Sequence, residues 1–348
     1  MILRTCAAMA LVFLLGMGSL FANAAADWAA ILALDAGPKR KPASKDEVIL
    51  LARNHLLIQR KALESFLSTY PRDAKAPSAQ LRLAGVLATE GNMDSNPRQI
   101  QEALKMLAGV EANPLAPNQL RADAGFRKAS IVMQSASPST PQGVKTIVAA
   151  ARQFSGAYPT DLRAARLFVE AATVCDNTPA LKRKLLEEAK QMTTEDSLQR
   201  RIADDLMRLD LLGKTFDLSL PALSGDTIQL AAHRGTVVLL IFWSSEAPQS
   251  LLWLRDFKTQ WEKLGASAPK VVTVNLDSSR REAEERAAAF PSSWQVGYEP
   301  GGWQSATDRR LGINALPSVW VIDSRGILQS LNAKTDWTKW ASSGLLNE

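Results

Sequence analysis

Two different spacings of hydrophobic residues divide this chain near residue 212. Between residues 45 and 211, apolar side chains recur every three to four positions, which is the spacing of one face of an α-helix. Beyond residue 212 they alternate with polar residues or form short unbroken runs, as in β-strands. The pattern predicts an all-α region followed by an α/β region.

Prolines and asparagines interrupt the helical spacing at intervals, for example at Asn96-Pro97 and Thr178-Pro179. These interruptions predict about eight helices of roughly 15 to 25 residues, paired as hairpins. The first is expected to bury a face that includes Val48, Ile58 and Phe66.

One short phrase occurs twice in the helical region, at Phe66 to Pro71 and at Phe154 to Pro159. In both copies a Phe and a Tyr four residues later share a helix face, and a Pro ends the helix. The phrase resembles the helix ends of tetratricopeptide-like repeats in bacterial envelope proteins. Such arrays usually bind peptides or proteins on a concave surface, and a plain helical domain without a groove is the alternative.

The second region begins with a predicted hairpin, in which Ser224-Gly225-Asp226 turns the chain. The order of elements is β-β, β-α-β-α-β, α, β-β, α, which indicates a mixed sheet flanked by helices. Strands are expected at 237–243, 271–276, 319–322 and 327–329, and helices from Pro248 and over 279–289.

Composition narrows the possible chemistry. The 348 residues hold 41 Lys and Arg against 35 Asp and Glu, and most charges are interleaved, which argues against a dedicated nucleic-acid binder. Two cysteines and two histidines exclude a disulfide scaffold and disfavour a zinc site, so we expect no metal and no cofactor.

The N-terminus has the features of a secretory leader over residues 1–24. A positive start at Arg4 precedes an apolar stretch, and Ala22-Asn23-Ala24 offers the small residues that signal peptidase needs. Cleavage after Ala24 places the protein in the periplasm or otherwise outside a bacterial cytoplasm, and only an uncleaved leader anchors it in a membrane. Residues 25–44 are predicted to be a linker. Cys175 is then the remaining cysteine, and its helical spacing from Leu167 favours burial.

Several landmarks beyond residue 212 occur in the order found in one family. They are Gly213 to Phe216, His233-Arg234-Gly235, Phe242 to Ser245, Leu311 to Ser318 and Ile322-Asp323. Together they resemble thioredoxin-like proteins of the TlpA/ResA type. The resemblance implies that residues 212–348 form a thioredoxin-like domain, after a helical repeat domain at 45–211, and that Pro317 is the cis-proline of that fold.

The catalytic position departs from the family pattern. Where the resemblance places the two cysteines of Trp-Cys-Pro-Pro-Cys, this chain has Ala247 and Ser250, and a peroxidatic cysteine would also fall at position 247. Thiol-disulfide exchange needs a low-pKa thiolate and a second, resolving thiol. No catalytic residue is therefore assigned.

Even without the cysteines, the resemblance implies a shallow groove between the helix that starts at Pro248 and the residue before Pro317. Leu316 would offer backbone hydrogen bonds to an extended chain, and Glu246 would interact with the helix dipole. The candidate residues of this vestigial site are Trp243, Glu246, Ala247, Pro248, Ser250, Leu316 and Pro317.

The sequence thus predicts an exported protein-binding or envelope-assembly protein with a redox-inactive thioredoxin-like domain and a protein or peptide partner in the cell envelope. The alternative is a thiol-disulfide oxidoreductase of the TlpA/ResA type, or an accessory partner of one. A ligand-binding module that uses exposed tryptophans is weaker, because Trp243 and Trp320 fit core positions. The identity of the partner and the oligomeric state stay open.

Overall fold

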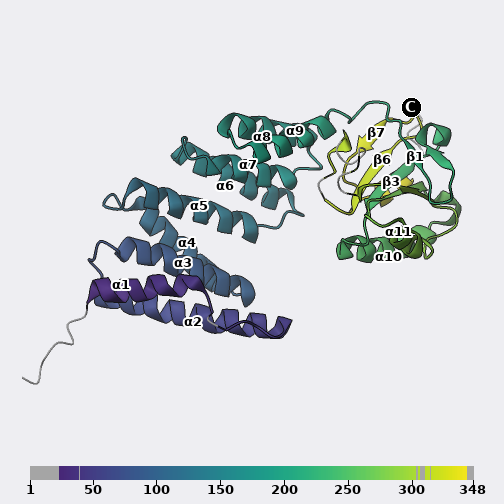
Figure 1. Ribbon diagram of the computed structural model, residues 1–348. Coiled ribbons are helices and arrows are strands. Elements are labelled where there is room, and N and C mark those ends of the chain that lie inside the picture. Colours follow the sequence, from purple (N-terminus) through teal and green to yellow (C-terminus); the bar gives the residue numbers. More distant parts are fainter. Residues whose placement is uncertain (1–22, 39, 303–304, 306–309, 314, 343–348) are drawn as a thin grey trace, which may run out of the picture. The chain divides into compact units, whose positions relative to one another are not determined.

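The computed structural model describes residues 23–38, 40–302, 305, 310–313 and 315–342 (Figure 1). The predicted leader at 1–24 therefore lies almost entirely outside the described residues. Contacts divide the chain into two compact units, Met1–Leu167 and Phe168–Glu348, and each is described by itself. The boundary at 212 that the composition suggests stays a prediction.

The first unit is built from helices that pack against their neighbours in sequence. Side-chain caps start several of them: Ser44 accepts from the N–H of Glu47, Asn96 from that of Arg98, and Thr140 from that of Gly143. From residue 24 to residue 157, each helix packs on the next, as hairpins require. The helices are α1 (Ala24–Ala33), α2 (Lys45–Thr69), α3 (Ala76–Met93), α4 (Pro97–Ala112), α5 (Asn118–Ser135) and α6 (Pro141–Ala157), and α7 (Arg163–Thr173) crosses into the second unit.

The all-α character predicted for residues 45–211 is confirmed, with eight helices over that range. The last two are α8 (Pro179–Met192) and α9 (Asp196–Leu209), which pack on each other in the second unit. Helices α7, α8 and α9 have 11, 14 and 14 residues, so they are shorter than predicted. The tetratricopeptide-like character of the hairpins stays a prediction.

Two local expectations for the first unit differ from the structure. Helix α1 occupies the first part of the predicted linker, because Asn23 caps it and its Trp28 ring lies 5.4 Å from that of Phe66. Val48 and Ile58, which were expected to be buried, are 49% and 53% exposed. The buried residues of α2 lie in its C-terminal half, where Leu63 and Phe66 join the core.

Tyr158 ties the end of α6 to α4 and α5. Its hydroxyl donates to the carbonyl oxygen of Arg121 at 3.0 Å and lies 3.3 Å from Oε1 of Glu111. Its ring lies 5.3 Å from that of Phe154. A Cβ at Gly125 would come within 2.6 Å of the Tyr158 ring, so glycine lets the ring rest on α5. Burial and the charge of Glu111 raise the pKa of Tyr158.

We expect Tyr158→Ala to lower the free energy of unfolding by about 2 kcal/mol, since a half-buried ring and its hydrogen bonds are lost. Tyr158→Phe removes only the hydroxyl and costs about 1 kcal/mol. Urea unfolding followed by far-UV circular dichroism measures both. The control is Leu162→Ala, because Leu162 is 65% exposed. If Tyr158→Ala costs no more than this control, Tyr158 does not join the hairpins.

A five-stranded mixed sheet forms the centre of the second unit, with strand order β5-β4-β3-β6-β7. Strands β3, β4 and β5 are parallel, while β6 runs antiparallel to β3 and β7 antiparallel to β6. A separate antiparallel hairpin, β1 (Ser219–Pro221) with β2 (Thr227–Gln229), precedes the sheet as predicted. The sheet strands are β3 (Val238–Trp243), β4 (Lys270–Asn275), β5 (Gln295–Tyr298), β6 (Ser318–Ile322) and β7 (Leu328–Ser330).

Strand β3 is buried on both faces, as its unbroken apolar run predicts. Because successive side chains point to opposite faces, Leu240 and Phe242 join the core beside the hairpin, whereas Leu239 and Ile241 face α10 (Pro248–Glu262). Figure 1 shows α10 below the strands, near α11 (Arg280–Ala287). The pattern had not located β5 by its residues.

These features make the C-terminal region an α/β domain with a thioredoxin-like fold, and the predicted two-part architecture is confirmed. Within the described residues, none of the helices combines the length and the hydrophobicity that crossing a bilayer requires.

Candidate functional site

The loop between β3 and α10 is held by a buried polar network that begins at Ser244. The Ser244 hydroxyl donates to Oδ1 of Asp277 at 2.5 Å and accepts from the N–H of Glu246 at 3.0 Å. The N–H of Ser245 donates to the same carboxylate oxygen at 2.7 Å. Ser244 and Asp277 are both fully buried. The loop that carries the predicted site is therefore fixed by a carboxylate from the segment just after β4.

Asn275 completes this network from β4. Its side-chain amide donates to Oδ2 of Asp277 at 3.0 Å, and its side-chain oxygen accepts from the N–H of Asp277 at 2.9 Å. Asp277 thus receives three hydrogen bonds where its side chain is buried, which is what a buried carboxylate needs. Sequence reasoning missed this group, although the polar residues Asn275 and Asp277 at the end of a core strand were a usable signal.

Helix α10 begins at the loop with Ala247 as its N-cap. Ala247 has an extended backbone and no side chain that can cap, and Pro248 occupies the first helical position. The N–H of Ser250 donates to the carbonyl of Ala247 at 2.8 Å. Ser250 is fully buried, and its Oγ has no hydrogen-bond partner among the described residues.

Two other predicted site residues have structural contacts. Trp243 is wholly buried at the end of β3, with its ring 5.1 Å from that of Phe290. Glu246 is exposed, and its Oε1 accepts from the hydroxyl of Ser278 at 2.9 Å and from its N–H at 3.3 Å. Glu246 therefore contacts the loop that follows β4.

The segment before β6 contains a cis peptide bond between Leu316 and Pro317. The Leu316 side chain is 6% exposed and belongs to the core cluster against which Ala247 packs. In the part of the chain that the structure describes, neither the N–H nor the carbonyl of Leu316 takes part in a hydrogen bond. The structure therefore brings the start of α10 and the Leu316 segment to one end of the sheet.

A second hollow lies in the first unit, between α5 and α6. It has a volume of about 500 Å³, and Lys128, Val132, Lys145 and Phe154 are among its lining residues. Lys128 also forms an ion pair with Glu111. The groove has both apolar and charged walls, which suits a protein segment better than a metal ion.

Neither site contains a thiol. Cys175 is 1% exposed, and its Sγ donates to the carbonyl of Ala171 at 3.2 Å. Burial raises the pKa of the Cys175 thiol. Cys6 lies outside the described residues. Among the residues that the structure describes, no three His, Cys, Asp or Glu side chains gather as metal ligands would.

Comparison with known proteins agrees with the topology of the C-terminal region. Residues 212–331 match the AhpC/TSA family. None of the curated proteins matches the sequence. The match and the sheet topology both support a thioredoxin-like redoxin domain over these residues.

Many solved structures are similar to this chain, including the following three. A Chlorobium tepidum protein, provisionally named thiol:disulfide interchange protein DsbE, is 26% identical, with 39% of this chain and 97% of that chain covered and a TM-score of 0.31. A thioredoxin-like protein from Bacteroides caccae is 12% identical, with 67% and 87% covered and a TM-score of 0.42. A thiol-disulfide oxidoreductase from Bacteroides fragilis is 19% identical, with 36% and 96% covered and a TM-score of 0.31.

Proposed function

We propose that this protein binds an extended protein segment at the groove between the start of α10 and Leu316, and that it does so without thiol chemistry. It acts as an exported binding or assembly protein of the bacterial cell envelope. The observation that carries the proposal is the backbone of Leu316 beside α10, whose N–H and carbonyl have no hydrogen-bond partner among the described residues, in a region with no cysteine from 212 to 348.

The positions that would carry the chemistry support the redox-inactive part. Ala247 and Ser250 stand at the N-cap and the third position of α10, and neither supplies a sulfur atom. Exchange needs a thiolate that attacks and a thiol that resolves the mixed disulfide. Cys175 cannot replace either, because it is buried and its pKa is raised.

Backbone chemistry supports the binding part. An N–H and a carbonyl on one residue can pair with an added strand, the way in which many domains bind extended peptides. Leu316 has both groups uncommitted within the described residues. The polar network under the neighbouring loop holds this end of the sheet in place, which lowers the ordering cost of binding.

The remaining parts of the chain fit an envelope protein. The groove of about 500 Å³ between α5 and α6 is a second place where a partner could dock, and the leader at 1–24 would export the chain. The alternative function, thiol-disulfide exchange or service to an enzyme that performs it, draws its support from the AhpC/TSA match at 212–331. Only the accessory form of that alternative is compatible with the missing cysteines.

We expect insulin disulfides to be reduced in dithiothreitol no faster with the purified protein than in a buffer control, since the protein presents no thiolate. Turnover that persists in Cys175→Ser would contradict the redox-inactive assignment.

The binding test uses nuclear magnetic resonance on the full chain with an uncharged peptide, acetyl-AVQVATA-amide. The amide signal of Leu316 should shift in a saturable way, while that of Leu252, which is 56% exposed on α10, should not. If the Leu316 signal stays in place at millimolar peptide, the groove does not bind extended chains.

A further inference from the structure

Within the unit Phe168–Glu348, helix α9 lies against the segment that leads to Pro317. Gly312 has a φ of +60°, and a Cβ there would lie 3.1 Å from the backbone oxygen of Asp204 and 3.4 Å from Cγ of Arg208. A second contact joins the helices to the sheet region, since the side-chain amide of Asn332, after β7, donates to Oδ2 of Asp176, between α7 and α8, at 2.6 Å. The residues that precede the sheet region thus form one wall beside the proposed groove.

Between these two parts lies a pocket of about 190 Å³. Ala315, Pro317 and Ser318 line it on the side of the sheet, so it borders directly on the segment next to Leu316. Four basic residues also line it: Lys182, Arg201, Arg208 and Lys334. This volume is below the roughly 300 Å³ at which small-molecule sites begin, so it suits one side chain or a chain terminus.

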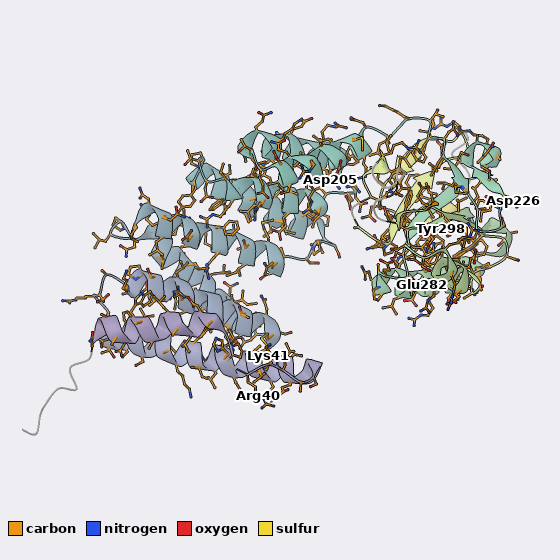
Figure 2. All side chains as sticks on the ribbon, viewed as in Figure 1. Arg40, Lys41, Asp205, Asp226, Glu282 and Tyr298 are labelled. Carbon is orange, nitrogen blue, oxygen red and sulfur yellow. The ribbon has the colours of Figure 1, made fainter. Side chains whose placement is uncertain are left out.

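Two of the four cations already have carboxylate partners. Lys182 lies 2.5 Å from Oδ1 of Asp176, and Arg208 forms an ion pair with Asp205, which is labelled in Figure 2. Asp204, outside the lining, also acts on Arg208.

Arg201 and Lys334 differ from that pair. Among the described residues, neither takes part in an ion pair with a carboxylate. Burial lowers the pKa of Arg208, and the like charge of Arg201 contributes to this lowering. The lining therefore holds four cations against two carboxylates, Asp176 and Asp205, and this excess of positive charge favours an added anion.

We infer that this pocket binds a carboxylate of the extended segment held at Leu316. The carboxylate belongs either to an acidic side chain or to the C-terminus of the segment. The inference rests on the proposed function, since it names the class of segment that the groove prefers. Arg201 supplies a planar fork that matches a carboxylate, and Lys334 adds a point charge from the other wall.

The experiment measures dissociation constants of the full chain by calorimetry with three peptides. The first is uncharged acetyl-AVQVATA-amide, the second is acetyl-AVEVATA-amide, and the third is acetyl-AVQVATA with a free C-terminal carboxylate. At least one of the two anionic peptides should bind about tenfold more tightly than the uncharged one, as a charge-assisted hydrogen bond allows. Which of them does so identifies the source of the carboxylate.

A double variant, Arg201→Gln with Lys334→Gln, should remove this preference and leave the affinity for the uncharged peptide unchanged. The matched control is Lys263→Gln, since Lys263 is exposed and lies outside the pocket. It should keep the preference. Equal affinity for all three peptides overturns the carboxylate pocket alone, and so does a preference that survives in the double variant.

If no peptide binds, the proposed function fails. A smaller probe then tests separately whether the pocket binds a carboxylate. Glutarate should shift the side-chain amide signals of Asn332, which lines the pocket, and should do so in the wild type but not in the double variant. Absence of that shift overturns the pocket independently of the groove.

Discussion

Replacing Ala247 and Ser250 together with cysteine should give a protein that forms an internal disulfide. The two positions are the N-cap and the third residue of α10. Residues three apart at the start of a helix have Cα atoms roughly 5 to 6 Å apart, within the range that a disulfide spans. The change would convert a chain that has no thiol in this domain into one with a closed pair.

The thiol at position 247 should also be reactive. The start of α10 has N–H groups and a helix dipole that stabilise a thiolate, so its pKa should fall below the roughly 8.5 of a free cysteine. Ala247 is half-buried, whereas Ser250 is fully buried, so position 247 is the accessible one. Weak reduction of insulin should therefore appear where the wild type has none.

Glu246 limits the gain, because a carboxylate beside a thiolate raises its pKa. Adding Glu246→Gln should lower the pKa of the thiol and increase the reductase rate. Thiol titration and the mass change after alkylation detect the disulfide. The pH dependence of alkylation measures the pKa of the thiol. Two thiols that stay unbridged under mild oxidant, with circular dichroism unchanged, would show that positions 247 and 250 do not correspond to the cysteine pair.

The second large effect is expected at Asp277. Asp277→Ala should lower the free energy of unfolding by about 3 to 5 kcal/mol, because three hydrogen-bond donors lose a buried acceptor. These donors are the hydroxyl of Ser244, the N–H of Ser245 and the side-chain amide of Asn275. The loop before α10 should lose its fixed conformation at the same time.

Urea unfolding followed by tryptophan fluorescence suits this measurement, since eight of the nine tryptophans lie beyond residue 212. Asp277→Asn keeps one acceptor and should cost less, which preserves a folded variant if the alanine form does not fold. Asp256→Ala is the matched control, because the Asp256 side chain is 62% exposed, and its cost should stay within about 0.5 kcal/mol. A loss below about 1 kcal/mol for Asp277→Ala would mean that water replaces the carboxylate.

Hydrophobic spacing predicted most of the sheet region because its strands are dense in apolar residues. The unbroken run at β3 and the helix after Pro248 need no knowledge of distant partners. Strand β5 was not predicted, because it has only four residues, mixes polar and apolar side chains and is only partly buried. In α2, periodicity alone could not show which face and which part of the helix its partners cover, so Val48 and Ile58 were placed wrongly.

The candidate site was predictable only where local chemistry defines it. Pro248 marks a helix start by itself, and the segment at Pro317 was found through the family resemblance. The tie between Ser244 and Asp277 joins residues that are 33 positions apart, and no local pattern encodes it. The pocket beside Pro317 depends on the packing of α9, which the spacing of its own residues does not specify.

Gly312 is a position where two demands of different origin coincide. A positive φ excludes most side chains for reasons of backbone geometry, and a Cβ would lie only 3.1 Å from the backbone oxygen of Asp204 in α9. Any residue other than glycine would therefore strain this turn and press on α9, and the wall of the pocket beside Pro317 would have to shift.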